Sequence, residues 1–134
     1  MKFQVIAKKI LTFNQPSVNG NIYTQEVLDK ALADPEFVKK LDAGKILVGV
    51  MSGFNVDDRV FRPDAVCGKV ISLITTQDGL YGTFSLEDET VAGKTLLPYV
   101  KRDKVDFGCI GQGEDIDGKL TDYNILGVTI SIIE

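Results

Sequence analysis

Residues 66–86 have the sequence VCGKVISLITTQDGLYGTFSL. Two runs rich in β-branched and aromatic residues, Val66 to Thr76 and Leu80 to Leu86, lie on either side of Asp78-Gly79. An Asp-Gly pair between two such runs is one of the strongest short-range signals for a β-hairpin. Neither run has a clearly polar face, so we expect both faces of the hairpin to be partly covered.

More strands are predicted on both sides of this hairpin. Residues 3–13 predict a strand with one solvent-exposed face. The apolar run from Ile46 to Met51 predicts a short central strand that is buried on both faces. Val105 to Gly111 and Lys119 to Ile133 predict a final strand pair around Asp117-Gly118. In the last strand, alternation places four apolar residues on one face: Leu126, Val128, Ile130 and Ile132.

Helix signals occur in two places. Thr24 is the predicted N-cap of a helix over residues 25–33, and Asp34 followed by Pro35 predicts a second helix that Gly44 ends. Thr90 to Val100 predict a third, although Gly93 and Pro98 weaken the pattern. These elements predict one α+β domain over residues 1–134, with a mostly antiparallel, partly closed β-barrel of about six or seven strands and two or three flanking helices.

Composition excludes several functional classes. The chain of 134 residues is 44% hydrophobic and 25% charged, as in ordinary globular proteins. A net charge of −4 argues against nucleic-acid binding, and we interpret the basic cluster of Lys101, Arg102 and Lys104 as a solvated surface patch. The sequence has neither 18 consecutive apolar residues nor a signal-peptide pattern, so we expect no membrane partner.

We also expect no metal and no other cofactor. The sequence has no histidine and no Cys-x-x-Cys motif. Asp57 and Asp58 lie in a long polar loop over residues 52–65, without the spaced oxygen ligands of a cation site, and are interpreted as solvated carboxylates. Cys67 and Cys109 are expected to be free thiols.

The order of four segments along the chain resembles that of a known protein family. The segments are NGNIYTQEVLDKAL (19–32), CGKVISLITTQDGLYGTFSL (67–86), LLPYVKRDKVDFGCIG (96–111) and DYNILGVTISIIE (122–134). Together they resemble the bacteriophage prohead (head-maturation) protease family, whose fold is shared with herpesvirus assemblins. Asn21 stands where that family usually has a basic residue.

The resemblance implies where catalytic residues would lie. The family's nucleophile is a serine in an S-x-G motif, and the matching position here is Cys109 in Cys109-Ile110-Gly111. Its general base is a histidine that would fall within Met51, Ser52, Gly53 and Phe54, where the chain has none. Loss of a triad member costs about 10⁴ to 10⁶ in rate.

We therefore expect no enzyme, with Cys109 as a vestigial nucleophile position and Met51 and Ser52 marking the missing-histidine region. Lys101, Arg102 or Lys104 beside Cys109 could stabilise a thiolate, but protonation of the leaving group would still lack an acid. We interpret Cys67 and Cys109 as small buried residues. Glycines 108, 111 and 113 fit either remnants of an oxyanion site or a β-bulge, and the bulge is favoured.

The resulting hypothesis is a non-catalytic capsid accessory protein, such as a decoration or cement protein. It would bind the major capsid protein or other virion proteins in the capsid, and occupy the host cytoplasm during assembly; self-association into a homo-oligomer stays open. One alternative is an active maturation protease that uses Cys109. Another is an internal scaffold or core component that leaves the head.

Overall fold

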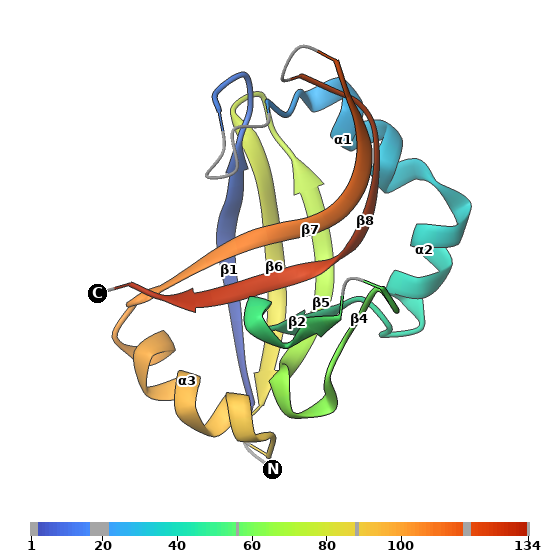
Figure 1. The fold of residues 1–134 in the computed structure, drawn as a ribbon. Coiled ribbons are helices and arrows are strands. Elements are labelled where there is room, and N and C mark those ends of the chain that lie inside the picture. Colours follow the sequence, from blue (N-terminus) through green and yellow to red (C-terminus); the bar gives the residue numbers. More distant parts are fainter. Residues whose placement is uncertain (1–2, 17–21, 56, 88, 117–118, 134) are drawn as a thin grey trace.

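A six-stranded sheet, curled into a half-barrel, dominates the computed structural model (Figure 1), which describes residues 3–16, 22–55, 57–87, 89–116 and 119–133. The strand order is β1-β6-β5-β2-β8-β7. Strands β1 (Phe3–Thr12), β6 (Gly79–Glu87) and β5 (Val66–Thr75) form one half, and β7 (Val105–Ile116) and β8 (Lys119–Ile132) cross in front of it. The predicted α+β, mostly antiparallel fold is confirmed.

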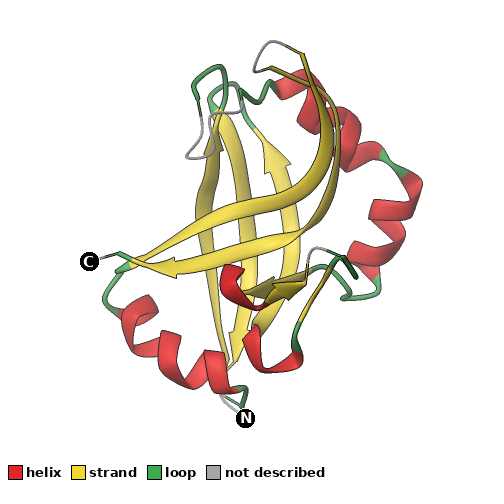
Figure 2. Ribbon diagram, in the orientation of Figure 1, coloured by secondary structure: helices red, strands yellow, loops and turns green. Residues whose placement is uncertain are grey.

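In the described part of the chain, three α-helices lie outside the sheet (Figure 2). Helices α1 (Gln25–Ala33) and α2 (Pro35–Asp42) follow each other as predicted, and α3 (Val91–Lys101) precedes β7. The predicted caps are present: the Thr24 side chain accepts from the backbone N–H of Val27, and the Asp34 side chain accepts from that of Glu36. Gly44, at φ +70°, follows α2 in the left-handed conformation that glycine tolerates best. None of the helices in the described part of the chain is long and apolar enough to cross a bilayer.

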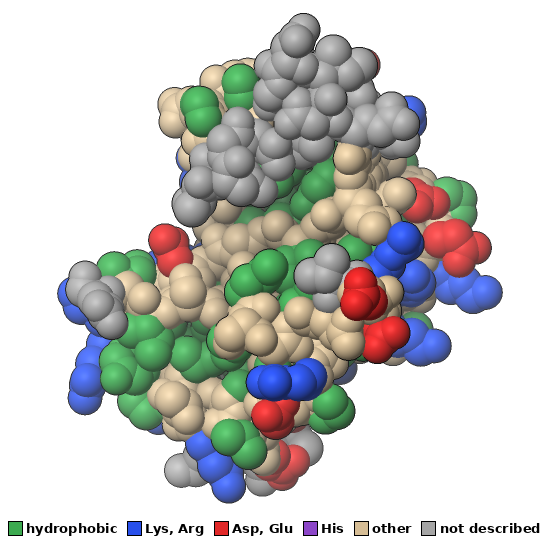
Figure 3. All heavy atoms as spheres, viewed as in Figure 1, with side chains coloured by type: hydrophobic (Ala, Val, Ile, Leu, Met, Phe, Trp, Pro, Cys, Tyr) green, Lys and Arg blue, Asp and Glu red, His purple; other side chains and the backbone are tan. Residues whose placement is uncertain are grey.

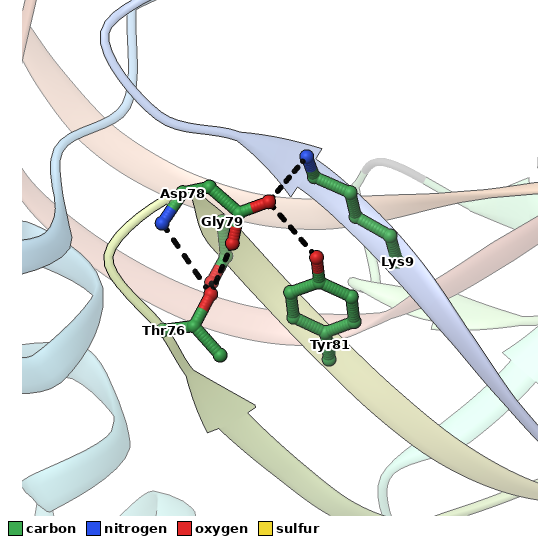
Figure 4. A network of polar contacts seen from close by, with 5 residues as sticks. All are labelled: Lys9, Thr76, Asp78, Gly79 and Tyr81. Atoms are coloured by element: carbon green, nitrogen blue, oxygen red, sulfur yellow. Dashed lines mark hydrogen bonds and ion pairs between the residues drawn. The ribbon is translucent and has the colours of Figure 1, made fainter.

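The predicted hairpin is confirmed as β5 and β6, with Thr75 opposite Leu80. In its turn the Asp78 carboxylate accepts hydrogen bonds from the Thr76 hydroxyl, from the Tyr81 hydroxyl at 2.9 Å and from the Lys9 ammonium at 3.0 Å (Figure 4). Because Lys9 belongs to β1, this carboxylate ties the hairpin turn to the neighbouring strand. We expected both faces of the hairpin to be partly covered. This is only partly correct, since Ile71 and Ile74 are 46% and 59% exposed.

The central strand is shorter than predicted. Strand β2 covers only Leu47–Gly49 and lies between β5 and β8, antiparallel to the first and parallel to the second. Its central position is confirmed. Met51, predicted as the last residue of this strand, instead begins a short 3₁₀ helix, η1 (Met51–Gly53).

The polar loop predicted over residues 52–65 has local structure of its own. Strands β3 (Phe54–Asn55) and β4 (Val60–Phe61) pair as a small hairpin, and a second 3₁₀ helix, η2, covers Pro63–Ala65. The Phe61 ring packs edge-on against Phe54, with 5.1 Å between ring centroids. This hairpin covers part of the β2 and β8 backbone.

The final strand pair is confirmed, but one face of it was predicted wrongly. The β7–β8 register changes between Ile110, opposite Gly127, and Gly111, opposite Ile125, so Leu126 is an extra residue on β8. A bulge of this kind reverses the alternation of side chains. The inward residues are therefore Tyr123 and Ile125 before the bulge and Val128 and Ile130 after it, while Leu126 is only half-buried. The predicted Asp117-Gly118 turn lies outside the described residues.

The main core fills the space between the two halves of the half-barrel. The fully buried Phe84 of β6 stacks on Phe107 of β7, with ring centroids 4.5 Å apart and planes inclined by 21°. Leu28 and Ala31 of α1, and Leu96, Leu97 and Val100 of α3, belong to the same core. The two outer strands β1 and β7 also approach each other, and an ion pair joins Lys8 of β1 to Asp103 in the turn before β7.

Candidate functional site

Cys109 lies in a row of three residues on adjacent strands. Cys109 of β7 is opposite Val128 of β8, which is opposite Val48 of β2. Directly opposed residues share one face of a sheet. Val48 and Val128 are completely buried, so the thiol points toward the core, where it is half-buried and packs against the core cluster.

Two tyrosines provide the polar surroundings of this thiol. The hydroxyl of Tyr123 interacts with the Cys109 thiol and with Tyr23, whose ring meets the Tyr123 ring edge-on at 5.4 Å between centroids. Tyr123 comes from β8, and Tyr23 lies just before α1. No local sequence signal predicts this grouping, because it depends on the bulge that turns Tyr123 inward.

Burial controls the protonation of both groups. It raises the pKa of Cys109 to about 11, with the hydrogen bond from Tyr123 acting in the opposite direction. The pKa of Tyr123 is also raised, first by burial and then by the neighbouring Cys109 and Tyr23. At neutral pH the thiol and the phenol are therefore both protonated, and neither can take a proton from the other.

On the outward face of the same strands, the row next to Cys109 offers no nucleophile–base pair. Its adjacent row is Gly108 of β7, Thr129 of β8 and Gly49 of β2. The only side chain of this row with a polar group is that of Thr129, which is half-buried. A threonine hydroxyl needs an adjacent base to become a nucleophile, and the two glycines beside it supply none.

Phe61 packs over this outward face. A Cβ atom on Gly49 would lie 2.6 Å from the Phe61 ring, and one on Gly127 would lie 3.1 Å from it. The absence of side chains at these two positions lets the aromatic ring pack directly on the backbone of β2 and β8. The structure therefore uses these glycines for packing.

Met51 and Ser52 do not adjoin Cys109. The register places Val48, three residues before Met51, in line with Cys109, and β8 lies between β2 and β7. Two strand spacings, about 10 Å, therefore separate Val48 from Cys109, and Met51 and Ser52 lie beyond the end of β2, in η1. Both residues are exposed, whereas Gly53 is buried and Phe54 half-buried.

The basic residues are also distant from the thiol. Lys101 ends α3, Arg102 follows it, and Lys104 precedes β7; all three side chains are exposed. Lys104 is five residues before Cys109, or about 16 Å along an extended strand. A cation can stabilise a thiolate only when it lies beside the sulfur. None of these three side chains lies beside the Cys109 sulfur.

Among the glycines of β7, Gly111 fits the bulge interpretation. Gly111 stands at the register shift, and a Cβ there would lie 2.3 Å from the carbonyl oxygen of Asn124 and 2.4 Å from the Tyr123 ring. The ring of Tyr123 therefore lies against the bare backbone at Gly111. Gly108 has the Thr129 hydroxyl 2.8 Å from the position of a Cβ.

The other candidate residues form no site. Cys67 is a buried free thiol on β5, 3.6 Å from the backbone carbonyl oxygen of Val48, and burial raises its pKa to about 12. Asp57 and Asp58 donate their backbone N–H groups to the Asn55 side chain in an exposed turn. Within the described ranges, no three Cys, Asp or Glu residues are grouped as metal ligands.

Comparison with known proteins gives the fold a precedent. No family model matches the chain, and no curated protein sequence does. The capsid assembly protease gp21 of bacteriophage T4 matches with a TM-score of 0.67 and 16% identity, over 97% of this chain and 81% of that one. The protease of varicella-zoster virus matches with a TM-score of 0.44 and 14% identity, over 97% of this chain and 64% of that one. The chain therefore has a prohead-protease-like fold, as the sequence resemblance implied.

Proposed function

We propose that this chain is a non-catalytic capsid accessory protein, of the decoration or cement kind, which binds the major capsid protein. The observation that carries the proposal is the state of Cys109. At the position where the resemblance puts the nucleophile, a core-facing thiol has a pKa of about 11 and tyrosine hydroxyls for neighbours. The whole sequence has no histidine that could serve as its base.

The size of the expected loss of reactivity at Cys109 favours a structural role. A thiol with a pKa of about 11 is ionised in only about one molecule in 10⁴ at pH 7. A missing general base and acid reduces triad catalysis by a factor of about 10⁴ to 10⁶, and this loss overlaps with the low thiolate fraction because both reflect a nucleophile that stays protonated. The likeness to a phage capsid assembly protease supports a place in capsid assembly, and the chemistry at Cys109 favours binding over cleavage.

The first test is the amount of this protein in virus particles. Quantitative mass spectrometry of empty precursor heads and of finished particles should find it in both, in a fixed ratio to the major capsid protein. Presence in precursors with loss from finished particles would instead identify an internal scaffold, and the decoration role would be wrong.

The second test addresses proteolysis directly. Purified protein is incubated with capsid and scaffold precursors, beside a Cys109→Ala variant that has an unchanged circular dichroism spectrum. We expect no cleavage by either protein. Cleavage by the native protein that Cys109→Ala abolishes would establish an active cysteine protease and overturn the proposal.

A further inference from the structure

Strand β8 extends beyond its pairing with β2. In the described part of the chain, β2 pairs with β8 only at Val48 and Gly49, opposite Val128 and Thr129, whereas β8 continues to Ile132. On its other side β8 stays paired with β7 to the end, with Ile132 opposite Val105. The last residues of β8 therefore present one strand edge that β2 does not cover.

Apolar side chains surround this edge. Ile132 and Ile133 are 39% and 45% exposed, and Met51, in the 3₁₀ helix that contacts β8, is 55% exposed. Figure 3 shows hydrophobic side chains gathered over α3 and the C-terminal end of β8. We call Met51, Ile132 and Ile133, together with this strand edge, the β8-end surface.

A basic rim borders the β8-end surface. The backbone N–H of Ile133 donates to the carbonyl oxygen of Lys104, so the exposed isoleucines adjoin the turn between α3 and β7. That turn carries the exposed side chains of Lys101, Arg102 and Lys104, and its acidic residue, Asp103, is already paired with Lys8. Asp106, exposed on β7 opposite Ser131, and Glu134, which follows Ile133 in the sequence, reduce this excess but leave the basic side chains in the majority, in a chain whose net charge is −4.

We propose that the β8-end surface binds an extended, acidic segment of another protein. Its backbone would pair with the end of the β8 edge that β2 does not pair, its apolar side chains would cover Met51, Ile132 and Ile133, and its carboxylates would meet the basic rim. Strand addition of this kind takes affinity from backbone hydrogen bonds and specificity from side chains. Charge complementarity favours an acidic partner and disfavours a symmetric pair of copies of this chain, because paired basic rims would repel each other.

The inference does not depend on the proposed capsid role, and its test contains no virus particles. The probe is a fluorescein-labelled 12-residue peptide in which Glu alternates with Val, and its binding is measured by fluorescence anisotropy at low salt. Two comparison peptides replace every Glu by Lys or every Val by Ser. We expect binding of the first peptide only.

Matched variants locate the binding site on the protein. Charge reversal of Lys101, Arg102 and Lys104 to Glu should weaken binding about tenfold or more, because attraction becomes repulsion at three positions. The control reverses three exposed lysines on and after α2, Lys39, Lys40 and Lys45, and should leave the affinity within about twofold. Ile132→Ser with Ile133→Ser should also weaken binding. Equal weakening by both charge reversals, equal binding of all three peptides, or no binding at all would overturn the proposal.

Discussion

Cys109 and Asp78 are ionisable residues whose surroundings shift their pKa values in opposite directions. Burial raises the pKa of the Cys109 thiol, so this residue behaves as a small apolar side chain with a weak hydrogen bond. Hydrogen bonds from Thr76, Lys9 and Tyr81 lower the pKa of the exposed Asp78 carboxyl below its ordinary 3.8. The first shift suppresses reactivity, and the second makes a turn sensitive to acid.

Alkylation should reveal the suppressed reactivity of Cys109. At pH 7 an ordinary cysteine is a few per cent thiolate, so Cys109 should react with iodoacetamide roughly two orders of magnitude more slowly than in the urea-unfolded chain. Its rate should rise about tenfold per pH unit from pH 7 to pH 10. Cys67, whose pKa is raised to about 12, should be slower still. Mass spectrometry of labelled peptides measures both rates, and a plateau for Cys109 below pH 8 would show that the thiol is activated.

Replacement of Asp78 by asparagine should destabilise the protein at pH 7 and have less effect in acid. A carboxyl group with a lowered folded-state pKa adds stability above its unfolded pKa, and this stability is lost as the pH falls through the folded value. The urea midpoints of wild type and Asp78→Asn should thus differ at pH 7 and converge as the pH falls below about 4. Asp42→Asn, at another exposed carboxylate, is the control and should show no such convergence.

At the scale of elements, local signals predicted more than non-local ones could. Thr24, Asp34-Pro35 and Asp78-Gly79 fix caps and a turn through neighbours in sequence, and each predicted element is present. The extra residue at Leu126 and the parallel pairing of β2 with β8 depend on register between distant strands, which alternation alone does not encode. Prediction of the candidate site was limited for the same reason: Cys109 could be located on a strand as a small buried residue, but its tyrosine neighbours follow from that register.

Gly93 offers a test of how helix α3 docks on the sheet. Helix propensity alone favours Gly93→Ala by about 1 kcal/mol. A Cβ at this position, however, would lie 1.8 Å from the backbone carbonyl oxygen of Glu87, which ends β6, and 2.8 Å from the Thr90 hydroxyl that caps the helix. Overpacking of this kind costs about 1–3 kcal/mol. We expect net destabilisation of about 1 kcal/mol or more in urea unfolding, whereas Lys94→Ala on the exposed face should be nearly neutral; a stabilised Gly93→Ala would mean that α3 sits further from β6.

At the scale of the whole molecule, the curled sheet is stable only if its two halves hold each other. The edge strands β1 and β7 are joined by the Lys8–Asp103 ion pair, and an exposed pair of this type contributes at most about 1 kcal/mol. The larger contribution comes from the side chains enclosed between β6 and β7, where Phe84 stacks on Phe107. The positions of Cys109, the tyrosines and the β8-end surface all depend on this closure.

Phe84→Ala should therefore threaten the whole fold. Truncation of a buried phenylalanine costs about 3–5 kcal/mol, through lost burial and the cavity left behind. Domains of this kind have only about 5–15 kcal/mol in total, so the variant should be marginally folded or unfolded at 37 °C. Ile74→Ala, at a 59% exposed position on β5, should change the free energy of unfolding by no more than about 0.5 kcal/mol. Urea unfolding followed by circular dichroism measures both; a loss below about 1 kcal/mol for Phe84→Ala would mean that the halves fold independently, because a cavity at their shared face would then cost little.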